Sequence, residues 1–168
     1  ISYTERIPLH HGQLRILISR KGVRTSDNSV DTLIQWEKDN KIGEKSTCQD
    51  FAEKSISIKR NLNELLDKLK SEGKSIAGYG APAKATTLLN FLGLNNNKVQ
   101  YAIDRSPLKQ GLFIPGTDIE IKSPEILEKS KPDYLILFAW NFKEEILDQL
   151  SSYRDNGGKF IIPLPHLE

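Results

Sequence analysis

The sequence predicts an α/β fold: a Rossmann-like parallel sheet flanked by helices, preceded by an N-terminal β-hairpin and a long connecting helix. Three observations favour this class. The chain has 168 residues, which suits one domain with a proper core. From residue 73 onward, short apolar runs alternate with amphipathic stretches, as strands and helices do around a parallel sheet. A glycine-rich segment follows the first of these runs and opens a helical stretch.

The N-terminal part, residues 1–45, predicts strands and a short helix. Leu14 and Ile16 fall on one face of an extended chain, which indicates a β-hairpin or two short strands within residues 2–20. Apolar residues at helical spacing then predict a helix over residues 29–40.

Residues 46–72 give the clearest helical pattern in the chain. Phe51, Ile58 and Leu65 recur every seven residues, and Leu62, Leu66 and Leu69 complete the same apolar stripe. Gly73 is suited to end the helix. Because this helix leads directly into the next segment, it either packs on the core or connects to it as a strut.

Residues 73–166 carry the regular alternation of the expected Rossmann-like core, and residues 167–168 resemble a cloning remnant. We expect strands over 75–77, 99–103, 119–121, 134–138 and 159–162, and helices over 83–92, 124–129 and 142–153.

The segment from Gly78 to Ala83 fits the pattern G-x-G-x-x-A between a strand and a helix. In this context Gly78 is expected to allow the tight turn, Gly80 to let backbone N–H groups approach a phosphate, and Ala83 to pack closely on a strand. Lys84 and Thr86 add donors nearby. A glycine turn that serves packing alone is the alternative.

Two further segments are expected at the carboxyl ends of strands, where open α/β folds bind ligands. Asp104 ends the second strand, where a Rossmann fold places the acid that binds a ribose hydroxyl; a solvated turn is the equal alternative. After the third strand, Asn141 is suited to cap the next helix and Trp140 to line a pocket.

Composition excludes several classes of function. The net charge is +2 and the charges are interspersed, so no nucleic-acid partner is expected. No apolar run approaches the ~20 residues of a membrane span, and no membrane partner is expected. The single cysteine, Cys48, favours a reducing, cytoplasmic location. Since His10 and His11 lack partners at metal spacing, neither a metal site nor a catalytic residue is predicted.

Several runs, in order and with consistent gaps, resemble the C-terminal domain of SAM-dependent sugar C-methyltransferases. They extend across residues 73–165. The runs are Gly78–Asn90, Ile103–Gly111, Pro115–Thr117, Lys131–Tyr134, Ala139–Asn141, Gly157–Phe160 and Pro163–Pro165.

An N-terminal segment adds a weaker resemblance. Residues 10–15, HHGQLR, are similar to the family's His-Gly-Gly-Ser-Leu-Arg segment and depart from it at His11 and Gln13.

The resemblance implies a substrate and a division of labour. Family members methylate a carbon of a nucleotide-linked deoxy keto-sugar, here expected to be a dTDP-sugar, with S-adenosylmethionine as methyl donor. A zinc-binding N-terminal region and a central S-adenosylmethionine domain precede the C-terminal domain, which binds the nucleotide sugar in the cleft between domains. The chain begins at Ile1 and contains no methionine. We therefore expect a fragment that binds no cofactor itself, lacks the S-adenosylmethionine site, catalytic base and zinc, is inactive alone, and works with the N-terminal domains of the same chain.

The resemblance and the motifs together define an expected substrate-binding set. It comprises Gly78, Tyr79, Gly80, Ala81, Pro82, Lys84, Thr86, Asp104, Arg105, Lys109, Gln110, Pro115, Gly116, Trp140, Asn141, His10 and Arg15.

Two alternatives remain open at this point. The glycine turn and Asp104 are also typical of an NAD(P)-binding oxidoreductase domain. A non-catalytic module that docks or dimerises through helix 46–72 would leave apolar residues such as Leu62 and Leu69 exposed in the monomer.

Overall fold

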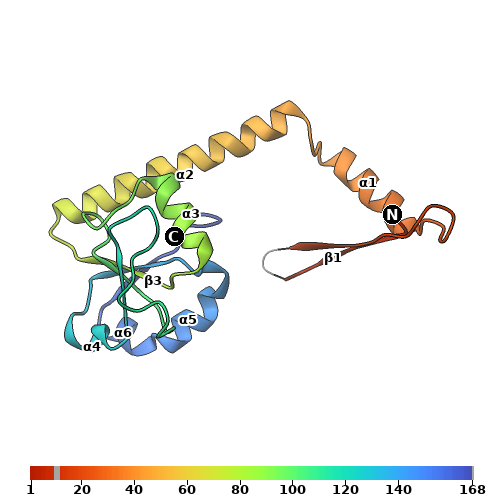
Figure 1. Ribbon diagram of the computed structural model, residues 1–168. Helices are drawn as coiled ribbons and strands as arrows, with labels where there is room; N and C mark the ends of the chain where they lie inside the picture. The colour runs from red at the N-terminus through yellow and green to blue at the C-terminus, as the bar shows by residue number, and fades with distance from the viewer. Residues whose placement is uncertain (10–11, 168) are drawn as a thin grey trace. The chain divides into compact units, whose positions relative to one another are not determined.

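The computed structural model describes residues 1–9 and 12–167, so His10 and His11 lie outside the described part of the chain. The chain divides into two compact units, an N-terminal unit, Ile1–Lys54, and a C-terminal unit, Ser55–Glu168. Helix α2, Lys45–Ser71, crosses this division (Figure 1). Within the described residues, no helix is long and apolar enough to cross a membrane.

The N-terminal unit contains a β-hairpin and one helix. Strand β1, Tyr3–Ile7, pairs antiparallel with β2, Gln13–Leu17, as the alternating pattern predicts. Helix α1, Asn28–Asp39, begins after Asp27, whose side chain accepts a hydrogen bond from Ser29 N. The helix is joined to the hairpin because Thr4 N donates to Ser29 Oγ at 3.0 Å and Thr4 Oγ1 donates to Ser29 O at 2.9 Å.

This N-terminal unit has almost no core of its own. None of its large apolar side chains within the described residues is buried, and Ile16 in β2 is 44% exposed. The Arg6 guanidinium lies 4.1 Å from the centre of the Trp36 ring, which covers part of that aromatic surface. Backbone pairing and these few side-chain contacts therefore hold the unit together, because burial of apolar area contributes little to it.

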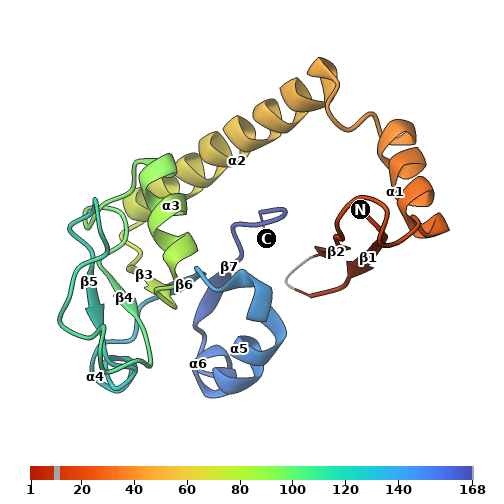
Figure 2. The ribbon, with the colours of Figure 1, turned by 45° about the vertical axis from the view of Figure 1, so that its right-hand side comes forward.

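The C-terminal unit has the predicted architecture, a five-stranded parallel sheet flanked by helices (Figure 2). The strand order is β5-β4-β3-β6-β7. The strands are β3, Ile76–Tyr79; β4, Tyr101–Ile103; β5, Glu120–Lys122; β6, Tyr134–Leu137; and β7, Lys159–Ile161. The helices besides α2 are α3, Ala83–Leu92; α4, Ile126–Lys129; the 3-10 turn η1, Trp140–Phe142; α5, Lys143–Gln149; and α6, Ser151–Asp155.

The two faces of the sheet bury separate apolar clusters because side chains alternate along each strand. Ile136 and Phe138 lie on one face with α3 and with Leu62, Leu66 and Leu69 of α2. On the other face, the neighbouring residues of β6 form a cluster with α4, α5 and α6. The central strands are consequently apolar throughout, as expected of a parallel sheet covered on both sides.

Two expectations about the helices are wrong in detail. In α2 the expected stripe is buried at Leu62, Leu66 and Leu69 but not at its first member, since Phe51 is 72% exposed. The helix expected over 142–153 is interrupted at Leu150, whose ψ of 23° leaves helical geometry. Serines follow this residue, and their side chains compete for backbone hydrogen bonds and weaken a helix interior.

Candidate functional site

The candidate site lies at the carboxyl edge of the sheet, where the loops after β3, β4 and β6 meet. These three strands are neighbours and run parallel, so their carboxyl ends share one edge. The topology thus brings together three of the predicted segments, around Gly80, Asp104 and Trp140.

The two glycines of the motif have different roles from those expected. Gly78 lies inside β3, where an added Cβ would overlap the Phe138 ring, so it is required for packing rather than for the turn. Gly80 makes the turn, with φ at +83°, a conformation that favours glycine. The expected packing of Ala83 on a strand is wrong, because Ala83 is exposed and Ala85 is the buried alanine of α3.

Most N–H donors of the turn already have acceptors within the protein. Gly80 N donates to Ile103 O at 2.7 Å, Ala81 N donates to Asp104 Oδ2 at 2.8 Å, and Pro82 has no N–H. The N–H groups of Ala83 and Lys84 open α3, where an α-helix offers them no internal acceptor. Donors for an anionic ligand are therefore concentrated at the first turn of α3.

Asp104 fastens the glycine turn to the loop after β4. Its Oδ2 accepts from Ala81 N and from Lys109 Nζ at 3.0 Å, and its Oδ1 accepts from Ser106 N at 2.9 Å. Lys109 Nζ also donates to Ala81 O at 3.1 Å, and Gln110 Nε2 donates to Asp104 O at 3.1 Å. Burial alone would raise the pKa of Asp104, but the hydrogen bonds from Ser106, Ala81 and Lys109 outweigh it and hold the pKa below its usual value.

We expect Asp104→Asn to lower the free energy of unfolding by about 1–2 kcal/mol at pH 7, because the charge and one acceptor oxygen are lost from a side chain that is only 13% exposed. A group whose pKa is depressed by folding stabilises the fold above its unfolded pKa of about 3.9 and loses this effect as the pH falls through the folded value. Urea denaturation between pH 7 and pH 2.5 should therefore show a difference between wild type and variant that begins to shrink near pH 3.9 and continues to decrease as the pH falls toward the lower folded pKa. A difference that stays constant down to pH 2.5 would contradict this role.

Lys84, Trp140 and Asn141 form a second group at this edge, from α3 and η1. Lys84 Nζ lies 4.3 Å from the centre of the Trp140 ring and donates to Asn141 Oδ1. Partial burial lowers the pKa of Lys84 because it disfavours the charged form. The expectation that Asn141 caps the next helix is wrong, since Asn141 lies inside η1 and α5 begins without a side-chain cap.

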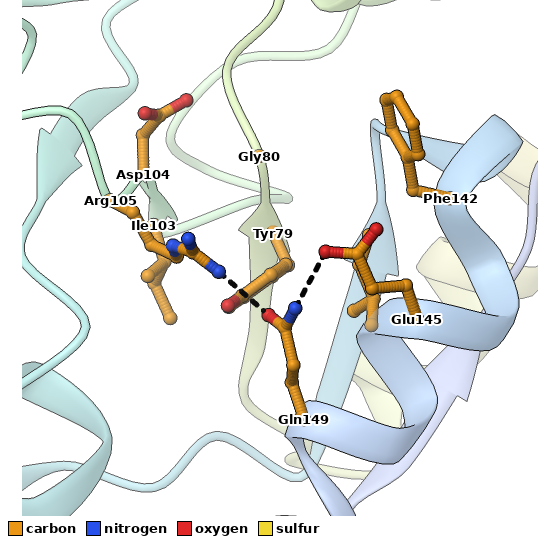
Figure 3. Close-up of a pocket in the computed structure, with 9 residues that line it drawn as sticks. Tyr79, Gly80, Ile103, Asp104, Arg105, Phe142, Glu145 and Gln149 are labelled. Atoms are coloured by element: carbon orange, nitrogen blue, oxygen red, sulfur yellow. Dashed lines mark hydrogen bonds between the residues drawn. The ribbon is translucent and has the colours of Figure 1, made fainter.

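A hollow of about 250 Å³ opens on the α5 side of the same edge. Arg105 Nη1 donates to Gln149 Oε1 at 3.0 Å, and Gln149 Nε2 donates to Glu145 Oε1 at 2.8 Å (Figure 3). Figure 3 also shows the Asp104 carboxylate directed away from these side chains. The lining residues are Tyr79, Gly80, Ile103, Asp104, Arg105, Phe142, Glu145, Ile146 and Gln149.

Sequence reasoning missed Phe142, Glu145 and Gln149 as lining residues of this hollow. Their signal is the spacing of Glu145 and Gln149, four apart on a helix that directly follows a strand of the predicted sheet.

Pro115 and Gly116 contact Asn90 near the end of α3, away from the glycine turn. Asn90 Nδ2 donates to Pro115 O at 3.0 Å and to Thr86 O at 2.8 Å, and a Cβ at Gly116 would overlap the Asn90 amide. Asn90 lies two turns beyond Ala83, about 10 Å along the helix, so these contacts anchor the loop away from the glycine turn.

The N-terminal candidates belong to the other unit. Arg15 forms a cross-strand ion pair with Glu5, 2.9 Å between Nη1 and Oε2, on an exposed part of the hairpin. His10 is outside the described residues. Among residues 1–9 and 12–167, no group of three or more His, Cys, Asp or Glu side chains is placed to hold a metal ion.

A parallel sheet with a positive-φ glycine turn and polar groups gathered at its carboxyl edge defines a Rossmann-like α/β domain. Comparison with known proteins identifies the family to which this domain belongs. Residues 8–165 match the family described as the C-methyltransferase C-terminal domain, and the chain belongs to that family. It is also 37% identical over 137 residues to the C-methyltransferase NovU of Streptomyces niveus, a match that covers 82% of this chain. The matched region is 33% of that relative's length, so the chain spans about a third of the curated protein it resembles.

Proposed function

We propose that this chain is the C-terminal, substrate-binding part of a SAM-dependent C-methyltransferase that acts on a nucleotide-linked deoxy keto-sugar. Its membership of the C-methyltransferase family supports the reaction class. The observation that carries the binding role is the position of the Lys84 ammonium, held over Trp140 by Asn141 beside the first turn of α3.

This group of residues suits a sugar diphosphate, a dTDP-sugar in our proposal. The Lys84 ammonium and the first N–H groups of α3 supply positive charge and donors to a diphosphate, and the helix N-terminus adds its partial positive charge. The half-buried Trp140 ring offers an apolar face on which a sugar can pack.

We place the S-adenosylmethionine site, the catalytic base and the zinc in the other domains of the enzyme, which act as partners of this one. A nucleoside cofactor bound in the Rossmann manner needs a carboxylate at the end of the second strand for its ribose hydroxyls. Here a ribose would have to compete with Ala81, Ser106 and Lys109 for Asp104, so these residues do not fit the ribose of S-adenosylmethionine. The same contacts weigh against the NAD(P)-dependent oxidoreductase.

Calorimetric titration with a dTDP-sugar tests the proposal. We expect the chain to bind the sugar nucleotide without methylating it, and Lys84→Ala to weaken binding by roughly ten- to a hundredfold, the value of one charge-assisted hydrogen bond. Lys159→Ala is the matched control, because Lys159 also lies over an aromatic ring, 5.6 Å from the centre of Tyr134, but at the start of β7. No binding by the wild type, or equal losses in the two variants, would contradict the proposal.

A further inference from the structure

We propose that the hollow between β3, β4 and α5 binds the nucleobase of the substrate, and that Gln149 and Glu145 recognise the base's hydrogen-bonding edge. This inference rests on the proposed function and extends it to a subsite with its own lining residues. The α3 side of the carboxyl edge would then hold the diphosphate, and the two subsites would meet at Gly80.

The size and the lining of the hollow suit a single planar ring. Its lining includes the apolar residues Ile103 and Ile146 and the aromatic residues Tyr79 and Phe142. Its volume of about 250 Å³ lies below the roughly 300–1,000 Å³ of pockets that enclose drug-sized ligands. A pyrimidine therefore fits better than a whole nucleotide. Aromatic walls with polar groups at the edge are also how proteins hold unstacked bases.

The charges in the hollow favour a neutral ring over a phosphate. The Glu145 carboxylate lies on the wall and would repel an anion, whereas it accepts hydrogen bonds from the N–H groups of a base. Arg105 Nη1 donates to Gln149, which in turn donates to Glu145, so the guanidinium is linked to a carboxylate that opposes a bound anion.

The polar edge offers both donors and acceptors along one line. Arg105 donates to Gln149, which donates to Glu145, so the three side chains are aligned before any ligand arrives (Figure 3). The remaining N–H groups of Arg105 can donate to a ring carbonyl, and the Glu145 carboxylate can accept from a ring N–H. The Tyr79 phenol is protonated at neutral pH and can donate a hydrogen bond, and burial raises its pKa further.

The test compares ligands with and without a base. We expect dTDP to bind more tightly than inorganic diphosphate, and Gln149→Ala to weaken dTDP roughly tenfold while leaving diphosphate affinity unchanged. Asn156→Ala is the matched control, because Asn156 lines the adjacent hollow beside α6, which Gln149 also borders, and does not line the proposed base site. In a ¹⁵N-labelled sample, thymidine alone should shift the amide signals of Tyr79, Arg105 and Gln149.

The outcomes separate the two proposals. If dTDP-sugar binds and responds to Lys84→Ala but not to Gln149→Ala, the base site is wrong and the proposed function stands. Thymidine shifts confined to residues outside the hollow would also overturn the base site. If the wild-type chain binds neither dTDP nor dTDP-sugar, the proposed function fails and the base site fails with it.

Discussion

Gly78→Ala is expected to lower the free energy of unfolding of the C-terminal unit by about 3 kcal/mol or more, at or above the usual range for overpacking a core. Gly78 lies in the central strand β3, and a methyl group there would overlap Phe138 Cε2 and lie 2.9 Å from Cδ2 and Cζ. Phe138 is fully buried in the cluster formed with α2 and α3, so its ring cannot swing into solvent to make room. The strand or the ring must move, and the interior packs too densely to absorb either movement cheaply.

Gly93 is the control that distinguishes the steric overlap at Gly78 from the general effect of replacing a glycine by alanine. Gly93 ends α3 with φ at +71° and has open space where a Cβ would be, so Gly93→Ala should cost only the backbone strain of about 1–2 kcal/mol. Urea denaturation followed by Trp140 fluorescence in a Trp36→Phe background reports on the C-terminal unit alone. Phe138→Leu combined with Gly78→Ala should recover part of the loss. Equal costs at Gly78 and Gly93 would show that Gly78 is needed for its backbone freedom instead.

The sequence predicted the C-terminal unit well because its signals are local and repeated. Apolar runs of four or five residues alternate with helical stretches, and the first helix was expected at the residues where α3 lies, Ala83–Leu92. The expected strand at 75–77 stops short of β3, which continues through Gly78 and Tyr79. Its end was missed because the motif assigns the first glycine to the turn, whereas the requirement at Gly78 comes from Phe138, sixty residues away in sequence.

The sequence predicted where the candidate site lies, but not which hydrogen bonds its residues form or which residues line the hollow. Parallel topology alone places Gly80, Asp104 and Trp140 at one edge of the sheet. Asp104, however, turns toward the N–H of Ala81, and no spacing rule distinguishes that contact from a ribose contact. Gln149 lines the hollow because α5 lies beside the ends of β3 and β4, a tertiary arrangement that no local sequence pattern reveals.

Leu66→Ala is expected to destabilise the C-terminal unit by about 2–5 kcal/mol, the usual cost of emptying a fully buried leucine position. Leu66 is fully buried with Leu62 in the cluster that α2 shares with α3 and the sheet. The same helix is tied to the end of α3, because Asn63 Nδ2 donates to Leu92 O at 3.1 Å. The surroundings of Leu66 are thus held from several sides and have little freedom to collapse into a cavity, which favours the upper part of the range.

Ile56→Ala is the control on the same helix, because Ile56 is 60% exposed and its truncation should change stability by no more than about 0.5 kcal/mol.

The Leu66→Ala and Ile56→Ala variants also test whether the chain dimerises through α2. That alternative needs Leu62 and Leu69 at the surface, but they are 0% and 4% exposed in the single chain, so charged substitutions there would unfold the unit rather than separate a dimer. Light scattering should therefore give one mass for the wild type and for Ile56→Ala, while denaturation separates Leu66→Ala from both. A Leu66→Ala variant of unaltered stability but lower mass would restore the helix-mediated dimer.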